Sequence, residues 1–324
     1  MQLTELCSLL KQSRSKILVW GDLILDEYQW CTADRVSPEA PVLVCQVNYS
    51  TYEAGGAGNV VRNIASLSGG VHFLSRMGKD EPAKILKKVL DHDQIDLAGI
   101  YELDQFSSTV KTRVMAHKQQ VLRVDKEDCR PPLLDCETFW MTYLDQVLPH
   151  SAALVVSDYG KGAIQPGCLQ QMIQKAQNCS VPVIVDPKGC DFSKYRGATV
   201  ITPNMKEFLA VTEGIIQSEA DILEQGVALL KKFEISVLVL TRSEKGISVI
   251  YDHGKKVDIA TKVQDVIDVT GAGDTVVAAL ARCLAAGVDL ETAAHFANLA
   301  ASVVVKKLGT ARCSLDEILA NEKS

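Results

Sequence analysis

A short segment late in the chain, residues 266–275, carries residue types that could transfer a phosphoryl group. It lies between a predicted strand over 255–260 and an alanine-rich, helical run over 275–286. Glycines let the backbone turn closely into that helix, where unpaired N–H groups and the helix dipole attract an anion. A carboxylate in the same turn would repel that anion, unless it accepts a proton from an attacking hydroxyl. The segment therefore predicts a general base, Asp274, beside an anion hole formed by Gly271, Ala272 and Gly273. A helix N-cap is the alternative role for Asp274, and these residues alone favour neither.

A second polar pair occurs at the start of another predicted helix, which follows a strand. Asn204 and Glu207 are three residues apart in Thr-Pro-Asn-Met-Lys-Glu, so both lie on its first turn. Beside ATP this pair could hold magnesium and its waters, because Mg²⁺ prefers oxygen ligands and keeps several waters. The structural alternative is that an acid on the first turn complements the helix dipole.

The amino-terminal half offers groups that suit the hydroxyls of a sugar. Asp22 and Asp26 follow the first predicted strand, at the edge where ligands of parallel sheets bind, although exposed loop acids are the alternative. Glycines at 55, 56 and 58 permit close approach of a ligand, and Asn59 and Asn63 lie one helical turn apart. A tight turn capped by Asn59 is the alternative there. The segment fails the dinucleotide fingerprint, because position 61 is valine.

Apolar strands alternate with helical periods over most of the chain. The pattern predicts an α/β fold: an open, doubly wound, mainly parallel sheet with helices on both faces. Residues 42–47 and 109–125 instead alternate like half-buried antiparallel strands and predict a small projecting β lid. We expect a single domain over 1–324, with the lid drawn from about 22–52 and 101–126.

Composition narrows the class of protein. The net charge of −6 and the absence of a Lys/Arg cluster argue against a nucleic-acid partner. The ten cysteines are scattered and none forms a Cys-x-x-Cys pair, which is typical of a reducing compartment. No run approaches 18 apolar residues, and the first 16 residues are too polar for a secretory signal, so we expect a cytoplasmic protein without a membrane partner.

In order and spacing the motifs resemble the ribokinase (PfkB-type) family of sugar kinases. The resemblance rests on Gly55-Gly56-x-Gly58-Asn59, Asn204-x-x-Glu207 and Asp268-x-Thr270-Gly271-Ala272-Gly273-Asp274, and it covers essentially the whole chain. Further segments are similar to the branch that phosphorylates O1 of D-glycero-β-D-manno-heptose 7-phosphate, on the route to the ADP-heptose of lipopolysaccharide cores. These are residues 35–42, 119–125, 157–162, 186–189, 195–199 and 241–244.

The resemblance implies a role for each matching residue. Asp274 would deprotonate the sugar O1 hydroxyl. Asn204 and Glu207 fall at positions for ATP and Mg²⁺, the metal held through water, with Met205 and Lys206 between them. The nucleotide would be bordered by Thr241, Arg242, Ser243, Glu244, Gly246, Thr270 and Asn298. The sugar would be held by Asp22, Asp26, Gly55, Gly56, Asn59, Asn63 and Asp158. Asp268 matches a position that binds a monovalent cation in some relatives.

The substrate of that branch already carries a phosphate, so we expect a cationic clamp. The candidates are Arg113, Arg123, Lys161 and Lys188, with arginine preferred for bidentate contact. Lys188 could instead face the transferred phosphoryl group.

Three further expectations concern the whole chain. We expect a homodimer through the lid strands, which are too thin to bury both apolar faces. We also expect kinase activity only, without an adenylyltransferase domain, because the six histidines are dispersed. The alternatives are another PfkB-type kinase, of a hexose or a different sugar phosphate, and a sugar-phosphate-binding protein without catalysis; the intact Asp274 counts against the latter.

Overall fold

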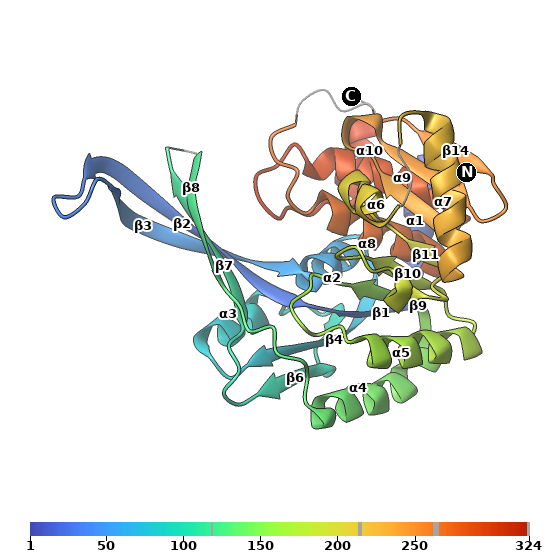
Figure 1. Ribbon diagram of the computed structural model, residues 1–324, viewed down its shortest axis with the longest axis horizontal. Coiled ribbons are helices and arrows are strands. Elements are labelled where there is room, and N and C mark those ends of the chain that lie inside the picture. Colours follow the sequence, from blue (N-terminus) through green and yellow to red (C-terminus); the bar gives the residue numbers. More distant parts are fainter. Residues whose placement is uncertain (118, 213–215, 262–265, 323–324) are drawn as a thin grey trace.

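The computed structural model describes residues 1–117, 119–212, 216–261 and 266–322 as an α/β body with a long projecting sheet (Figure 1). Within these residues the body sheet has ten strands, in the order β14-β13-β12-β11-β10-β9-β1-β4-β5, with β6 paired to β4. The pairs from β5 to β12 are parallel, and β13 and β14 are antiparallel additions. The strands are β1 Lys16–Gly21, β4 Gly70–Gly78, β5 Ile95–Asp96, β6 Ile100–Leu103, β9 Ser151–Ser157, β10 Val183–Asp186, β11 Val200–Ile201, β12 Val237–Thr241, β13 Ile247–Tyr251 and β14 Lys256–Ile259.

Helices cover both faces of this sheet, as its continuous apolar strands predict. In β1, Ile17 and Val19 point into one core with α1, α2, α3, α8, α9 and α10, whereas Leu18 and Trp20 point into the other with α4, α5, α6 and α7. The predicted open, doubly wound sheet is therefore confirmed. The helices are α1 Leu3–Gln12, α2 Ala57–Ser66, α3 Glu81–Val89, α4 Leu134–Val147, α5 Pro166–Asn178, α6 Met205–Val211, α7 Glu219–Phe233, α8 Ala272–Ala285, α9 Leu290–Val304 and α10 Leu315–Glu322.

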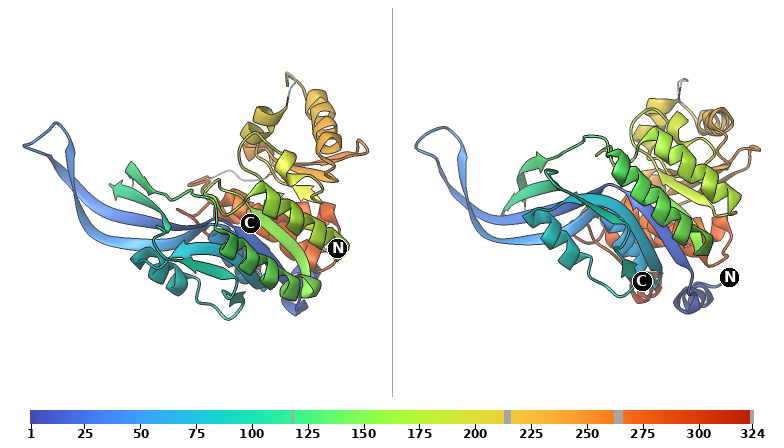
Figure 2. Two further views of the ribbon diagram at one scale, coloured as in Figure 1. Left: turned by 60° about the horizontal axis from the view of Figure 1, so that its bottom comes forward. Right: turned by 90° about the horizontal axis from the view of Figure 1, so that it is seen from below.

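A second sheet, the lid, extends away from the body in all three views (Figures 1 and 2). Its order is β3-β2-β7-β8, formed by β2 Leu23–Val36, β3 Leu43–Gly56, β7 Thr109–Ala116 and β8 Gln119–Lys126. Two details correct the sequence prediction. The predicted strand segments 42–47 and 109–125 are not neighbours, because β2 lies between β3 and β7. β2 pairs with β3 antiparallel but with β7 in parallel.

The body places polar residues along one edge of its sheet. Asp22, Asp158 and Asp186 stand at or just after the carboxyl ends of β1, β9 and β10, which are neighbours in the sheet. Asn204 and Thr241 stand at the corresponding ends of β11 and β12 and form a bridge. Because ligands of open parallel sheets bind at this edge, it is where a site should be sought.

Candidate active site

The start of α8 is the segment for which the sequence predicts an anion hole. Gly271 is the N-cap residue and has φ +78°, and a Cβ there would lie 2.6 Å from the Asn59 amide nitrogen, so only glycine fits. Ala272 donates to the Val269 carbonyl, whereas the backbone N–H groups of Gly273 and Asp274 have no acceptor within the described part of the chain. These two donors point outward at the positive end of a 14-residue helix.

Asp274 is held from two sides by side chains distant in sequence. Its Oδ2 accepts a hydrogen bond from the Asn59 amide at 2.7 Å, and its Oδ1 accepts one from the Tyr159 hydroxyl at 2.5 Å. Asn63 donates to the Asn59 side chain at 3.1 Å and accepts from the Thr275 hydroxyl at 3.2 Å. The alternatives of an N-cap role for Asp274 and a turn cap for Asn59 are therefore wrong. Each stands on the third residue of its helix, and the two form one buried network between α2 and α8.

The environment of Asp274 suits a base that works near neutral pH. The side chain is 3% exposed, and burial raises its pKa to about 6. The hydrogen bonds from Tyr159 and Asn59 lower that pKa, since they favour the carboxylate. Each carboxylate oxygen has a second lone pair, so both bonds leave room to accept a substrate proton.

A cavity of about 360 Å³ opens on one side of Gly273. Its walls include Val266, Val269, Val276, Ala301 and Val305, an apolar surface suited to a flat base. The predicted residues Thr241, Ser243, Glu244, Gly246 and Asn298 also line it.

The structure does not bring every predicted nucleotide residue to that cavity. Arg242 points away and donates to Glu219 and Ser248, each at 2.9 Å, so its assignment to the nucleotide is wrong. Met205 packs on the core around α6, and Lys206 is exposed. The Thr270 hydroxyl donates to Asp268 at 2.6 Å, and Asp268 also accepts from the Gly309 amide at 2.8 Å.

A smaller, polar cavity of about 150 Å³ shares Thr241 and Gly273 with the first and continues toward Tyr159. Asn204, Glu207, Asp186 and Lys188 line it. Asn204 and Glu207 cap α6 reciprocally at 3.0 Å, so their structural role is real, and the second oxygen of Glu207 accepts from Lys188 at 3.2 Å. Burial raises the pKa of Asp186 well above its usual range, with the nearby Asp274 and Glu207 carboxylates adding to the effect.

The other side of Asp274 is bordered by the part of the lid nearest the body, here called the root of the lid. It includes Asp26 on β2, Gly55 on β3 and Arg113 on β7. Asp26 is 3% exposed and forms an ion pair with Arg113 at 2.6 Å. A Cβ on Gly55 would lie 2.1 Å from the Asp26 carboxylate, so the glycine makes room for that acid. Both aspartates near β1 are buried, and the alternative of exposed loop acids is therefore wrong.

Asp22 and Asp158 instead organise the backbone of the site. Asp22 accepts backbone hydrogen bonds from Tyr159, Lys161 and Ala163 at 2.9–3.0 Å, which occupy both of its oxygens. Asp158 accepts from Lys194 and Tyr195 at 2.6 and 2.7 Å. The oxygens of Asp22 are taken up by the loop that carries Tyr159, which leaves it in a supporting role, whereas Asp158 also lines the polar cavity.

The predicted phosphate clamp is dispersed. Arg123 is exposed on β8 and pairs with Asp125 at 2.8 Å, Lys161 pairs with Glu127 at 2.7 Å, and Lys188 faces the polar cavity. Sequence reasoning missed three residues that lie closer to the base or to that cavity: Tyr159, Asp186 and Lys111. The first two lie within motifs recognised in the sequence, and their position directly after buried strands was the available signal. No sequence signal pointed to Lys111, because its position near Tyr159 depends on the pairing of β7 with β2.

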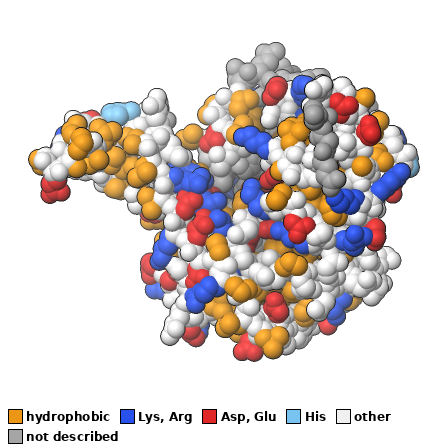
Figure 3. All heavy atoms as spheres, viewed as in Figure 1, with side chains coloured by type: hydrophobic (Ala, Val, Ile, Leu, Met, Phe, Trp, Pro, Cys, Tyr) orange, Lys and Arg blue, Asp and Glu red, His pale blue; other side chains and the backbone are white. Residues whose placement is uncertain are grey.

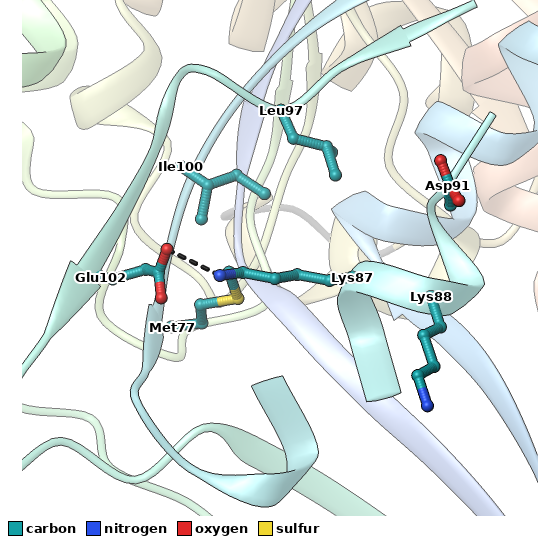
Figure 4. A pocket seen from close by; sticks show the side chains of 7 residues that line it. All are labelled: Met77, Lys87, Lys88, Asp91, Leu97, Ile100 and Glu102. Atoms are coloured by element: carbon teal, nitrogen blue, oxygen red, sulfur yellow. Dashed lines mark hydrogen bonds and ion pairs between the residues drawn. The ribbon is translucent and has the colours of Figure 1, made fainter. Parts of the chain in front are cut away.

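Another hollow lies at the edge of the body, between α3 and β6 (Figure 4). Lys87 and Glu102 form a 2.8 Å ion pair across it, beside Met77, Leu97 and Ile100. It shares no lining residue with the cavities beside Asp274.

Residues 14–317 match the model of the pfkB family carbohydrate kinases. The chain belongs to this family. It is 43% identical over 310 residues to the bifunctional protein HldE of Vibrio atlanticus and 42% identical over 306 residues to that of Haemophilus influenzae. Each alignment covers 94% of this chain but only 63% of the relative, so the chain spans less than two thirds of these proteins.

Solved structures confirm the ribokinase-like fold. Arabidopsis thaliana ribokinase, complexed with ribose and ATP, superposes with a TM-score of 0.77 at 19% identity and covers 96% of this chain and 100% of its own. Escherichia coli phosphofructokinase-2, in complex with potassium, gives 0.75 at 20% identity, with 96% and 98% covered. Among the described residues, no helix is both long and apolar enough to cross a bilayer.

Proposed function

We propose that this chain transfers the γ-phosphoryl group of ATP to O1 of D-glycero-β-D-manno-heptose 7-phosphate. The observation that carries the proposal is Asp274: a buried carboxylate, held by Asn59 and Tyr159, at the junction of a nucleotide-sized cavity and the root of the lid. The heptose assignment rests on the branch-specific segments of the sequence and on the HldE relatives.

The chain's residues divide the work of an in-line transfer. Asp274 takes the proton of the O1 hydroxyl while that oxygen bonds to the γ-phosphorus and the bond to the β-phosphate oxygen breaks. The free N–H groups of Gly273 and Asp274 stabilise the charge on the transferring group. The root of the lid borders the sugar side and would exclude water there.

Magnesium fits the polar cavity by the chemistry of its donors. Asn204, Glu207 and Asp186 bring oxygen atoms there, and Mg²⁺ commonly binds through waters and substrate phosphates with few direct protein ligands. The described residues contain no group of three or more acidic, histidine or cysteine side chains that could hold a metal alone. When bound, the ion would neutralise phosphate charge.

The remaining assignments are part of the same proposal. We assign residues 1–324 to one kinase domain with a lid, in the cytoplasm, where ATP is available. A monovalent cation near Asp268 remains a prediction. A homodimer through the lid is supported by its exposed apolar residues, among them Val47, Val121, Leu122 and Val124, and hydrophobic side chains are visible over the projecting sheet (Figure 3).

The test is ADP release by the purified protein with Mg-ATP and one sugar at a time. The panel contains D-glycero-D-manno-heptose 7-phosphate, ribose, fructose 6-phosphate and fructose 1-phosphate. We expect turnover confined to the heptose phosphate. Turnover on another sugar alone would replace the substrate assignment, and silence on every sugar, with ATP still bound, would favour a binding protein.

A further inference from the structure

The root of the lid contains a lysine, Lys111, that forms no ion pair with a carboxylate among the described residues. The neighbouring cations are paired: Arg113 with Asp26, Lys161 with Glu127, Lys188 with Glu207 and Lys194 with Asp158. Lys111 makes no ion pair or side-chain hydrogen bond with any residue that the structure describes. It is nevertheless half-buried, and burial lowers the pKa of its ammonium group. An ammonium group in such a place is costly unless an anion joins it.

The pairing of the lid strands explains why Lys111 has no carboxylate partner among the described residues. Its Cα faces that of Asp26 on β2 and that of Asp125 on β8, so carboxylates lie on both sides. Arg113 takes the Asp26 carboxylate at 2.6 Å, and Arg123 takes Asp125 with two contacts of 2.8 and 3.0 Å. Both acids are thus neutralised by arginines. Positive and negative side chains lie next to each other where the lid meets the body (Figure 3).

Tyr159 fixes the position of Lys111 relative to the base. The Lys111 ammonium lies 5.6 Å from the centre of the Tyr159 ring, and the hydroxyl of the same ring donates to Asp274. The same tyrosine ring therefore contacts both the Lys111 ammonium and the Asp274 carboxylate, which places the two groups within reach of one phosphorylated sugar. A sugar with its reacting hydroxyl at Asp274 would bring its far end to Lys111.

Lys111 also lies outside the lining of the two cavities that meet at Gly273. It lines neither the apolar cavity nor the polar one, whereas Tyr159 lines the polar cavity together with Lys188 and Gly273. The transferred phosphoryl group would arrive from the polar cavity, so an anion at Lys111 must belong to the acceptor sugar.

We infer that Lys111 binds the phosphate that the acceptor sugar already carries, and so selects phosphorylated sugars. The inference rests on the proposed function and names a residue for its substrate specificity. The Arg113–Asp26 pair beside it would orient the sugar, while Lys111 would supply the charge.

The test separates binding of the sugar phosphate from the transfer step. We expect Lys111→Met to raise the KM for the heptose 7-phosphate by about 10- to 100-fold, the value of a hydrogen bond to a charged group. The kcat and the KM for ATP should stay within about twofold, because Lys111 does not face the nucleotide. Lys111→Arg should restore most of the sugar-phosphate affinity. Lys126→Met, an exposed lysine on the same lid sheet, is the matched control and should behave as wild type.

Other results overturn the inference. A fall in kcat with an unchanged KM for the sugar phosphate would place Lys111 at the transferred group. Wild-type constants in Lys111→Met would remove it from the site. If Lys111→Met does not fold, as judged by circular dichroism, Lys111→Gln takes its place under the same criteria. Failure of the proposed function would appear separately, as wild-type protein that does not phosphorylate the heptose 7-phosphate.

Discussion

The two sides of the site are built by different means. The nucleotide side consists of backbone and short side chains: the free N–H groups of α8, the bare Cα of Gly273 and an apolar wall. The sugar side is crowded with charged groups that bond to one another, as Asp26 does with Arg113 and Asp22 with three backbone amides. Asp274 stands between them and belongs to both.

This difference suggests how one fold can keep the same phosphoryl transfer while different proteins accept different sugars. A nucleotide is recognised by a helix terminus and a cavity, which depend on backbone geometry. An acceptor is recognised by side chains on lid strands, which can be exchanged without disturbing the body sheet. Apart from Asp274, which belongs to both sides, a residue on one side should therefore be replaceable without loss of binding on the other.

Asp274→Asn should have the largest effect. It removes the base while keeping the shape and the hydrogen bond from Tyr159, so kcat should fall by about 10²–10⁴ or more. ATP binding, measured by calorimetry, should remain close to wild type, because Asp274 is not among the residues that line the nucleotide cavity. Near-normal turnover in this variant would contradict the role of Asp274.

Gly273→Ala should damage the nucleotide side alone. A Cβ at this position meets no atom within 4 Å, so it would project into the space that both cavities share. We expect the KM for ATP to rise by about 10-fold, the loss of roughly one charged hydrogen bond. Stability should hold or rise by up to about 1 kcal/mol, because alanine favours a helix over glycine. Wild-type affinity for ATP, with an unchanged melting temperature, would show that the phosphates of ATP do not bind against Gly273.

Tyr159→Phe should shift the pH dependence of the reaction. The base must be ionised, so activity is expected to fall below a pH of about 6, the pKa of Asp274. The Tyr159 hydroxyl stabilises the carboxylate and lowers that pKa; its removal should therefore move the acidic limb of the kcat profile to higher pH. The charges of Asp26, Lys111 and Asp186 also act on Asp274 and are the same in the variant and in the wild type.

Tyr143→Phe is the matched control for that experiment. The Tyr143 hydroxyl donates to Asp96 at 2.8 Å, a similar bond far from the site, and its loss should leave the kcat profile unchanged. If Tyr159→Phe and Tyr143→Phe give the same pH profile of kcat, the Tyr159 hydroxyl does not influence the pKa of Asp274.

Leu122→Glu should have the smallest effect on catalysis, and it should change binding of the sugar but not of ATP. Leu122 is 56% exposed on β8, and a charge there would oppose apolar contact between two lids. We expect a lower mass in sedimentation equilibrium and a modest rise in the KM for the sugar, with the KM for ATP unchanged. A wild-type protein that is already monomeric would contradict the lid dimer.

The sequence predicted the body and the start of α8 well, because both depend on local signals. Continuous apolar strands indicate a sheet covered on both faces, and the Gly-Ala-Gly-Asp segment defines a helix terminus. The role of Asn59 as a partner of Asp274 could not be predicted, since 215 residues separate them and only the packing of α2 on α8 brings them together.

The charged residues were harder to assign for a related reason. Arg242, Arg123 and Asp22 have the side chains that ligands require, but the fold gives each an internal partner. Whether a charged side chain is paired within the protein depends on strand register, as between β2 and β7. That register could not be predicted, because β2 itself was not predicted as a strand. The same register leaves Lys111 without an ion pair in the part of the chain that the structure describes.

The most direct test of the account is the ³¹P NMR spectrum of the product made from Mg-ATP and D-glycero-D-manno-heptose 7-phosphate. The account predicts a second sugar phosphate resonance, coupled to the anomeric proton, from wild-type protein, and almost none from Asp274→Asn over the same time. A new phosphate on any other carbon, or equal product from the variant, would contradict it.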